Sequence, residues 1–226
     1  MLHNKRIVVF GLGHFGGGIA VSRWLVEQGA HVIVTDKATP EKLAESLAQL
    51  ADLPIEYRLG EQNAADFSSA HLIVTSPAVK PDNELLEAAR LAGVPITTEI
   101  RLFIERCPAT IVGVTGTKGK STTASMLGAI LSRRHTTWVG GNIGKSLLAD
   151  LPNIRPDHKV ILELSSFMLH YLEPMRWSPH IALITLVTQD HLDWHGSLAA
   201  YLAAKQNIVR FQTPDDFAIV SEECPE

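Results

Sequence analysis

The chain has 226 residues, is 46% hydrophobic and carries a formal net charge of −4 at pH 7. This length suits two globular domains with sizeable cores, and the negative charge, with no basic stretch beyond Arg133-Arg134, excludes a nucleic-acid partner. No stretch approaches the roughly 18 apolar residues of a membrane span, and the apolar run at 7–10 is too short for a signal peptide. We therefore expect a soluble, cytoplasmic protein without membrane contact, in which Cys107 and Cys224 are incidental thiols.

The first hundred residues alternate strand-like and helix-like segments, which is typical of a parallel α/β domain. The predicted strands cover residues 6–10, 31–35, 55–58, 71–75 and 96–98. The predicted helices run from a glycine turn to about 28, from 40 to about 51, from a cap at Asp82-Asn83 to about 92, and from 99 to 105. The turn Ser76-Pro77-Ala78 follows the fourth strand, where strand ends line the ligand crevice of an open parallel sheet. A boundary near Thr98 divides the chain into domains 1–98 and 99–226.

A glycine-rich turn, G-L-G-H-F-G-G-G, joins the first predicted strand to the first helix. Gly11, Gly13 and Gly16 form a G-x-G-x-x-G pattern, and Asp36 ends the following strand. The pattern favours a nucleotide or dinucleotide site, in which Asp36 bonds a ribose or base edge. The alternative is a purely structural turn, with Asp36 capping a helix that begins near Pro40.

A second glycine turn lies in V-G-V-T-G-T-K-G-K-S-T-T, residues 112–123. A β-branched strand, a glycine loop and a run of helix formers follow one another here, which is the layout of a phosphate-binding loop. Gly116 and Gly119 let backbone N–H groups face an anion, Lys120 would neutralise phosphate oxygens, and Ser121 would offer its hydroxyl to Mg²⁺. Val114 replaces the first glycine of the general pattern. An ordinary strand-to-helix turn with a surface lysine is the alternative.

Three further clusters follow predicted strands of the second domain. G-G-N-I-G (140–144) follows a strand at 136–139 and places the amide of Asn142 where backbone can approach a ligand. Glu163 lies in the apolar strand 159–164, where a carboxylate must be paired or bound to a cation, so we predict a Mg²⁺ ligand. A structural salt bridge is the alternative.

The third cluster, T-L-V-T-Q-D-H-L-D-W-H-G (185–196), begins within a strand predicted at 181–187. His191 would therefore lie at the same sheet edge as the phosphate loop, where it can bind Mg²⁺ or phosphate, and Asp190 would orient it. Asp193 and His195 are weaker candidates, because helix capping explains them equally well.

The last predicted helix covers residues 197–210 and places Lys205 on the apolar face of Leu198, Leu202 and Val209. Such a lysine usually extends its ammonium group to solvent. If it is buried instead, its lowered pKa leaves a neutral amine, which can take up carbon dioxide as a carbamate and so become an oxygen ligand for metal. A strand at 217–221 follows.

Four motifs in this order, G-T-K-G-K-S-T, G-G-N-I-G, E-L-S-S-F and D-H-L-D-x-H-G…A-A-K, resemble the Mur ligases of peptidoglycan synthesis, from about Arg6 to the end of the chain. The G-L-G-x-x-G start, the S-P-A turn and E-L-S-S-F resemble the family member that adds D-glutamate. The resemblance implies a Rossmann-like N-terminal domain followed by a P-loop-type α/β ATPase domain, in a monomeric enzyme.

The resemblance also implies the chemistry. ATP would phosphorylate the carboxylate of UDP-N-acetylmuramoyl-L-alanine, and the amine of D-glutamate would attack the acyl phosphate. Lys120, His191 and Lys205 would be catalytic, with Lys205 carbamylated. The implied ATP contacts are Gly116, Thr117, Lys118, Gly119, Lys120, Ser121 and Thr122, and the implied metal ligands are Ser121, Glu163, His191 and Lys205. The implied substrate contacts are Gly13, His14, Phe15, Asp36, Ser76, Asn142 and Ser165.

Several positions depart from the family pattern. Met168 replaces a glutamine, Leu186 stands where asparagine is common, and Phe15 occupies the place of a small hydroxyl residue. Family members have three domains, so we expect this chain to be a fragment with little ligase turnover and an exposed sheet edge. Another Mur-type ligase is one alternative. A P-loop kinase, another NTPase or a nucleotide-binding module without catalysis would use the same loop, and an NAD-dependent oxidoreductase would explain the first domain only.

Overall fold

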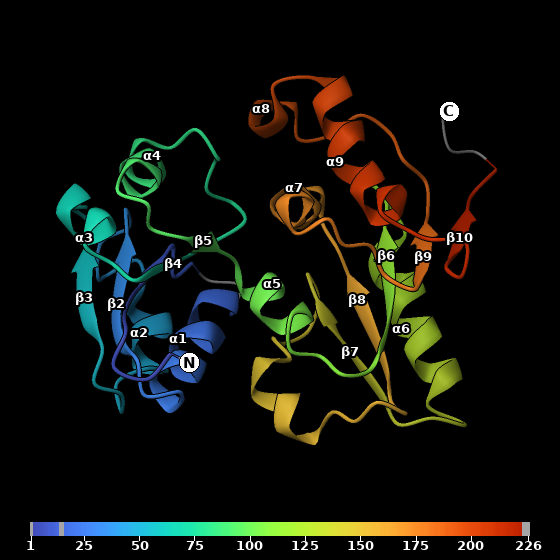
Figure 1. Ribbon diagram of the computed structural model, residues 1–226, viewed down its shortest axis with the longest axis horizontal. Coiled ribbons are helices and arrows are strands. Elements are labelled where there is room, and N and C mark those ends of the chain that lie inside the picture. Colours follow the sequence, from blue (N-terminus) through green and yellow to red (C-terminus); the bar gives the residue numbers. More distant parts are fainter. Residues whose placement is uncertain (1, 14–15, 223–226) are drawn as a thin grey trace. The chain divides into compact units, whose positions relative to one another are not determined.

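The computed structural model describes residues 2–13 and 16–222. The predicted nucleotide contacts His14 and Phe15 therefore lie outside the described residues. The chain divides into two compact units, Met1–Glu105 and Arg106–Glu226, each built on a five-stranded sheet with parallel pairing (Figure 1). The predicted α/β fold class is confirmed. None of the helices in the described part of the chain has the length and apolar character that a membrane crossing requires.

The first unit has the strand order β3-β2-β1-β4-β5. Its strands are β1 (Arg6–Phe10), β2 (His31–Asp36), β3 (Glu56–Leu59), β4 (Leu72–Thr75) and β5 (Ile96–Thr97), and its helices are α1 (Gly17–Glu27), α2 (Ala44–Ala48), α3 (Ala64–Ser68), α4 (Glu84–Leu91) and α5 (Glu99–Ile104). The predicted cap of α4 is confirmed, because the Asn83 side chain accepts a hydrogen bond from the Leu85 amide at 2.9 Å. The sequence predicts α5 at the start of the second domain, whereas its contacts group it with the first unit.

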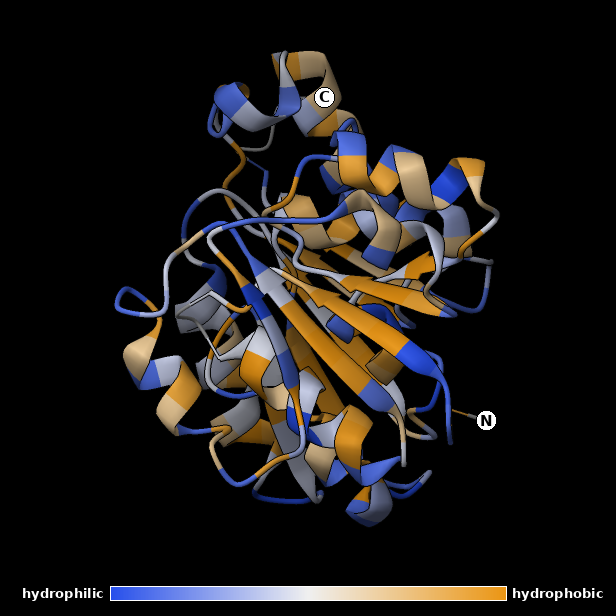
Figure 2. Ribbon diagram, turned by 90° about the vertical axis from the view of Figure 1, so that its left-hand side faces the viewer, coloured by the Kyte–Doolittle hydropathy of each residue, from blue (hydrophilic) through white to orange (hydrophobic). Residues whose placement is uncertain are grey.

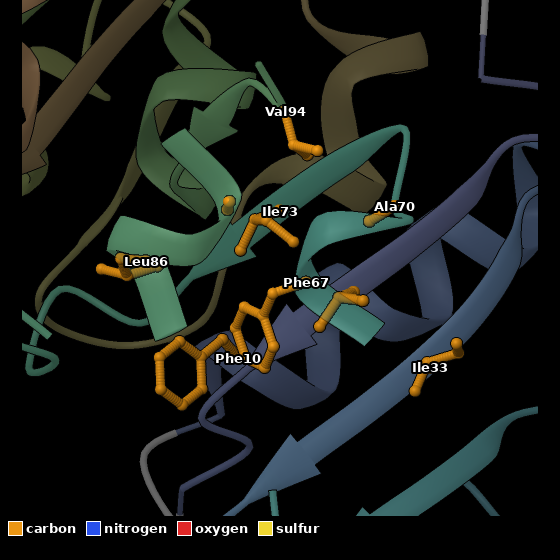
Figure 3. Close-up of a cluster of buried hydrophobic side chains, with 9 residues drawn as sticks. Phe10, Ile33, Phe67, Ala70, Ile73, Leu86 and Val94 are labelled. Carbon is orange, nitrogen blue, oxygen red and sulfur yellow. The ribbon is translucent and has the colours of Figure 1, made fainter. Parts of the chain in front are cut away.

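Alternate residues of β1 face opposite sides of the first sheet, as strand geometry requires. Val8 and Phe10 face a buried apolar cluster that α3 and α4 cover, which Figure 3 shows in close-up. The rings of Phe10 and Phe67 meet edge to face at 4.9 Å between centroids. This packing fixes the carboxyl end of β1, from which the first glycine turn departs.

The second unit has the strand order β10-β9-β6-β8-β7. Its strands are β6 (Thr110–Thr115), β7 (Thr137–Gly141), β8 (Lys159–Glu163), β9 (Ile181–Ile184) and β10 (Phe217–Val220). Its helices are α6 (Lys120–Leu131), α7 (Ser166–Leu172), α8 (Leu192–His195) and α9 (Leu198–Arg210), with short 3-10 segments η1 (Leu148–Asn153) and η2 (Glu173–Met175). The hydrophobic colouring in Figure 2 is concentrated in the strands, as expected for parallel sheets covered on both faces.

The central strand β6 presents different residues to its two faces. Val112 and Val114 pack with Ala124 of α6 in a buried cluster. On the other face, a Cβ at Gly113 would lie 2.7 Å from Pro179 Cγ and 3.3 Å from Ile208 Cδ1 of α9. Glycine therefore lets α9 lie close to β6, which brings the buried side of α9 to the phosphate loop.

Two predicted elements are wrong in extent. The helix predicted at 40–51 is limited to α2, and the Leu43 amide instead makes turn hydrogen bonds to the carbonyls of Thr39 and Pro40, both at 3.2 Å. The strand predicted at 181–187 ends at Ile184, because the following backbone turns to bond the phosphate loop. The short helix α3 and helix α7 were missed, although Asn63 and Ser165 cap them.

Strand β10 forms one edge of the second sheet, and all four of its residues are exposed. Phe217, Ile219 and Val220 are 60%, 54% and 52% exposed. No other strand of the described residues pairs with its outer side. The expected exposed edge is therefore present.

Candidate functional site

The helices that follow the two glycine turns have no side-chain cap. Gly16 and Gly119 are the N-caps of α1 and α6, both with φ of 85°. The other helices of eight or more residues within the described ranges, α4 and α9, are capped by the side chains of Asn83 and Ser197. The first-turn amides of α1 and α6 therefore keep the free donors and the positive dipole end that bind phosphate.

The phosphate loop is held by the segment after β9. The Thr117 amide donates to Leu186 O at 2.7 Å, and the Thr185 hydroxyl donates to Lys118 O at 2.7 Å. Gly116 has φ of 151°, and a Cβ there would lie 1.9 Å from Thr185 Oγ1. This contact makes glycine necessary at position 116 and leaves the amides nearer to α6 as the anion cradle.

Lys120 begins α6, and its ammonium group donates to the Thr117 carbonyl at 3.0 Å. The lysine thus closes over its own loop, within reach of an anion at the helix start. Ser121 lies exposed in the first turn of the same helix. Both side chains lie where the sequence predicts them, at the junction of loop and helix.

Glu163 ends β8, beside Val114 of β6 and Gly141 of β7 in the sheet register. It is 1% exposed. Its Oε1 accepts a hydrogen bond from the Asn142 amide at 3.0 Å, while its Oε2 is buried without a hydrogen-bond partner among the described residues. A buried carboxylate oxygen in this state fits a cation, and no described residue forms the salt bridge that was the alternative.

The loop G-G-N-I-G (140–144) forms hydrogen bonds directly with Glu163. A Cβ at Gly141 would lie 2.3 Å from Glu163 O, so glycine lets the two strand ends approach. The Asn142 backbone amide donates to the Glu163 carbonyl at 2.8 Å, in addition to its side-chain bond. Asn142 was predicted as a substrate contact, and in the structure it orients Glu163.

His191 has a left-handed backbone with φ of 50°, and its imidazole is 3.5 Å from Asp190 Oδ2. Asp190 also accepts a hydrogen bond from the His191 backbone amide at 2.9 Å, and its role in orienting the imidazole stays a prediction. The ring of Phe167 from α7 packs on the His191 ring with 4.7 Å between centroids. No group of three or more His, Cys, Asp or Glu side chains in the described ranges forms a metal cluster, so the predicted ligand set depends on Ser121 and Lys205 as well.

Lys205 is 4% exposed, so it does not extend its ammonium group to solvent. Its Nζ donates to Gly116 O at 2.7 Å and to Thr115 Oγ1 at 3.4 Å. The apolar face predicted for it is wrong, because Leu198 is 42% exposed. The buried side of α9 is instead formed by Tyr201, Ala204, Lys205, Asn207 and Ile208.

The charge state of Lys205 follows from this burial. Desolvation and the positive charge of Lys120 lower its pKa, Asp190 and Glu163 oppose the shift, and the net result is a pKa of about 7. The amine is therefore partly neutral near pH 7. Lys120 of the phosphate loop, Glu163 of β8 and Asp190 after β9 therefore all lie close enough to influence the charge of Lys205 on α9.

The sequence analysis missed Tyr201, which is 1% exposed on α9. Its hydroxyl is 2.7 Å from Thr117 Oγ1, and Lys205 Nζ lies 5.0 Å from the centre of its ring. An aromatic residue four positions before Lys205, on the same helix face, was the available signal.

His195 belongs to an aromatic cluster between α7, α8 and α9. Its Nε2 is 3.0 Å from Ser166 Oγ, and its ring stacks on Phe167 at 5.6 Å. Burial lowers the pKa of His195 to about 4, helped by the charges of nearby histidines and Lys205. The helix-capping role considered for His195 is therefore replaced by a packing role for a neutral imidazole.

Two predicted substrate contacts form intramolecular hydrogen bonds. Ser165 caps α7 by accepting from the Met168 amide at 3.2 Å. In the first unit, Asp36 accepts from the Gly13 amide at 3.2 Å and from the Ala38 amide at 2.9 Å. Asp36 thus holds its own glycine turn and does not cap a helix near Pro40.

Ser76 lies against the same turn. Its amide donates to Phe10 O at 2.7 Å, and a Cβ at Gly11 would lie 2.9 Å from Ser76 Cβ. The structure therefore brings Gly13, Asp36 and Ser76 to one edge of the first sheet.

Both units match models of the same protein family. The family model "Mur ligase middle domain" matches residues 114–226, and "Mur ligase MurD-like, N-terminal domain" matches residues 5–98. A UDP-N-acetylmuramoylalanine–D-glutamate ligase from Roseiflexus sp. (strain RS-1) is 46% identical over 99% of this chain and 48% of its own length. The ligase of the same name from Trichlorobacter lovleyi is 40% identical over 98% of this chain and 49% of its own length.

Among solved structures, the UDP-N-acetylmuramate–alanine ligase of Thermotoga maritima has 25% identity and a TM-score of 0.58, covering 98% of this chain and 50% of its own. A ligase described as MPL from Neisseria meningitides has 24% identity and a TM-score of 0.64. The match covers 97% of this chain and 72% of that ligase, and it supports the fold alone. The chain spans about half the length of the curated relatives it matches.

Proposed function

Because the chain belongs to the Mur ligase family, we propose that it forms part of an ATP-dependent ligase that joins D-glutamate to UDP-N-acetylmuramoyl-L-alanine. In this proposal domain 1–98 binds the uridine nucleotide and domain 99–226 binds ATP. Relatives named for this reaction match nearly the whole of the chain. The two-unit organisation, with one uncapped glycine turn in each, agrees with one nucleotide site per unit.

The residues of the second unit would act on ATP as follows. The free amides at the start of α6 and the ammonium group of Lys120 hold the β- and γ-phosphates and stabilise the transferring phosphoryl group. Ser121 and Glu163 would hold one Mg²⁺ and His191 a second, and such ions neutralise phosphate charge when bound. Asn142 keeps the carboxylate of Glu163 turned toward that position through its 3.0 Å hydrogen bond.

Carbamylation of Lys205 is the remaining part of the mechanism. The neutral amine forms an N–C bond with carbon dioxide and releases a proton, which changes a cation into an oxygen donor. A pKa of about 7 supports this step, because a large fraction of the amine is neutral in the cell. The resulting carboxylate oxygen would join His191 on a second Mg²⁺.

The observation that carries the proposal is the unpartnered Oε2 of Glu163, buried beside the phosphate loop. Burying an unpaired carboxylate oxygen is unfavourable unless a cation occupies the site during function. A nucleotide-binding module that did not use metal would have no need of it.

Calorimetric titration of the 226-residue chain with ATP, with Mg²⁺ and with excess chelator, tests this proposal. We expect Mg²⁺-dependent ATP binding, weakened by Glu163→Gln by about 10- to 100-fold. Glu173→Gln removes an equal charge from an exposed ion pair with Arg210 and should leave binding unchanged. Equal Mg²⁺·ATP affinity in Glu163→Gln and the wild type would refute the metal role.

The substrate is tested separately. UDP-N-acetylmuramoyl-L-alanine and NAD are titrated into different samples of the same chain. We expect binding of the UDP-linked substrate and none of NAD. Binding of NAD alone would overturn the assignment of the first unit and favour an oxidoreductase domain.

A further inference from the structure

Tyr201 touches two parts of the proposed ATP site, and the neighbouring His195, with one side chain. Its hydroxyl meets Thr117 of the phosphate loop at 2.7 Å, its ring lies 5.0 Å from Lys205 Nζ, and its ring meets His195 edge to face at 5.4 Å. With 1% exposure the ring is fixed in the packed interior. No role for this residue follows from the metal or phosphate contacts described above.

The Thr117 hydroxyl determines which way the hydrogen bond to Tyr201 runs. A hydroxyl has one proton to donate and two lone pairs to accept with. Thr117 Oγ1 donates to Thr188 O at 2.8 Å and accepts from the Thr188 amide at 2.9 Å. Its proton is thereby used, so the Tyr201 hydroxyl must be the donor at 2.7 Å. Burial raises the pKa of Tyr201, so the phenol keeps the proton that it donates.

These three hydrogen bonds saturate Thr117 and connect two segments that carry the site. Thr117 lies in the phosphate loop, three residues before Lys120, and Thr188 lies in the loop that continues to His191. Thr188 is exposed, so its two bonds to Thr117 compete with water. The hydrogen bond from Tyr201 fixes the Thr117 side chain in one orientation. In that orientation the Thr117 hydroxyl donates to Thr188 O and accepts from the Thr188 amide at the same time.

The ring of Tyr201 performs a second task on the same helix. It lies beside the ammonium group of Lys205, one turn further along α9, at a distance typical of a cation–π contact. Together with the 2.7 Å bond to Gly116 O, it holds Nζ close to the phosphate loop. The hydroxyl and the ring thus position different functional groups.

We propose that Tyr201 is a positioning residue for ATP, whose hydroxyl, through Thr117, locks the phosphate loop to the Thr188–His191 segment. The inference rests on the proposed ATP site of the second unit. Tyr201 does not touch the reacting atoms, and its effect reaches ATP through the loop. A tyrosine that only filled the core would affect stability and leave nucleotide binding unchanged.

The test uses Tyr201→Phe, which removes the hydroxyl and keeps the ring. We expect the affinity for Mg²⁺·ATP, measured by calorimetry on the 226-residue chain, to fall by about threefold to tenfold, the loss expected for one hydrogen bond. Exchange of the Thr188 amide hydrogen, measured by NMR without nucleotide, should become faster by a similar factor. The matched control is Tyr57→Phe, because the Tyr57 hydroxyl is buried without a hydrogen-bond partner among the described residues.

A double-mutant cycle identifies the route of the effect. Thr117→Val removes the hydroxyl at similar side-chain volume, and adding Tyr201→Phe to it should cost less than twofold further in affinity. Fully additive losses, or a lowered melting temperature with unchanged affinity and amide exchange, would overturn the proposal. If the wild type binds no ATP, the proposed function fails, and the Thr188 exchange rates in the same four proteins still decide whether Tyr201 locks the loop.

Discussion

The two units share one architecture but differ in how each treats its carboxylate. In both, a central strand ends in a glycine turn and a helix without a side-chain cap follows. In the first unit Asp36 uses both oxygens on backbone amides, one from Gly13 of the glycine turn and one from Ala38 after β2. In the second, Glu163 shares one oxygen with Asn142 and keeps the other without a partner. The shared topology places both carboxylates at the carboxyl ends of their strands. The hydrogen bonds that each carboxylate makes then determine whether it has an oxygen left for a cation.

The two glycine turns also differ in what surrounds them. Gly13 has φ of 60°, and a Cβ there would lie more than 4 Å from every described residue beyond its chain neighbours. Gly116 is pressed against Thr185, whose hydroxyl is committed to Thr115 O and Lys118 O. At Gly116 the second loop is therefore enclosed by the segment after β9.

The edges of the two sheets show a third contrast. The edge strand β3 of the first unit carries the charged side chains of Glu56 and Arg58, which discourage pairing with other chains. The edge strand β10 of the second unit reads F-A-I-V and carries no charge.

The largest expected effect is the loss of stability when a methyl group is added to the second glycine turn, which should exceed the loss in the first. Gly116→Ala should destabilise the chain by about 3 kcal/mol, because the new methyl group overlaps Thr185 Oγ1, which cannot move without breaking hydrogen bonds. Gly13→Ala adds only the strain of a positive φ, about 1 kcal/mol. Urea denaturation followed by tryptophan fluorescence measures both. Equal losses would show that the enclosure of the second loop has no energetic consequence.

The next largest effect is the pH dependence of stability that the buried Lys205 of the second unit causes. The folded pKa of Lys205 is about 7, below its usual value of 10.5. Between these values the unfolded chain holds a proton that the folded chain lacks, so stability rises with pH by at most about 1.4 kcal/mol per pH unit. Below pH 7 both states are protonated and this dependence ends.

Lys205→Met should flatten the curve between pH 7 and 10 in buffer free of carbon dioxide, measured by urea denaturation. Lys145→Met, at an exposed lysine paired with Asp150, is the matched control and should keep the wild-type slope. A wild-type stability that does not change over this range would contradict a buried, destabilised ammonium group.

The smallest effect concerns the uncharged edge. Ile219→Lys gives β10 a charged side chain, as β3 already has. The concentration at which the 226-residue chain self-associates should therefore rise about tenfold, which corresponds to ~1.4 kcal/mol in the free energy of association. Analytical ultracentrifugation over a concentration series measures this. Leu91→Lys alters an 82% exposed leucine on the helix α4, which belongs to no edge strand, and should change little. Similar shifts in both variants would point to general solubility and not to edge pairing.

The sequence by itself determined the strand–turn–helix rhythm, both glycine turns and the residues at the strand ends, because these depend on local spacing and on conformations that only glycine adopts freely. It also predicted Lys120, Glu163, His191 and Lys205, whose residue types are unusual for their surroundings. It misjudged the helix at 40–51 and the end of β9, where turn and loop hydrogen bonds override the apolar pattern.

Only the tertiary structure decided what each of these side chains does. Whether Lys205 reaches solvent depends on how closely α9 packs on Gly113, and whether Glu163 is satisfied depends on Asn142, which is distant in sequence. Tyr201 gained its proposed role only because α9 places its hydroxyl against Thr117. Burial and hydrogen-bond partners arise from contacts between distant segments, and local sequence patterns do not contain that information.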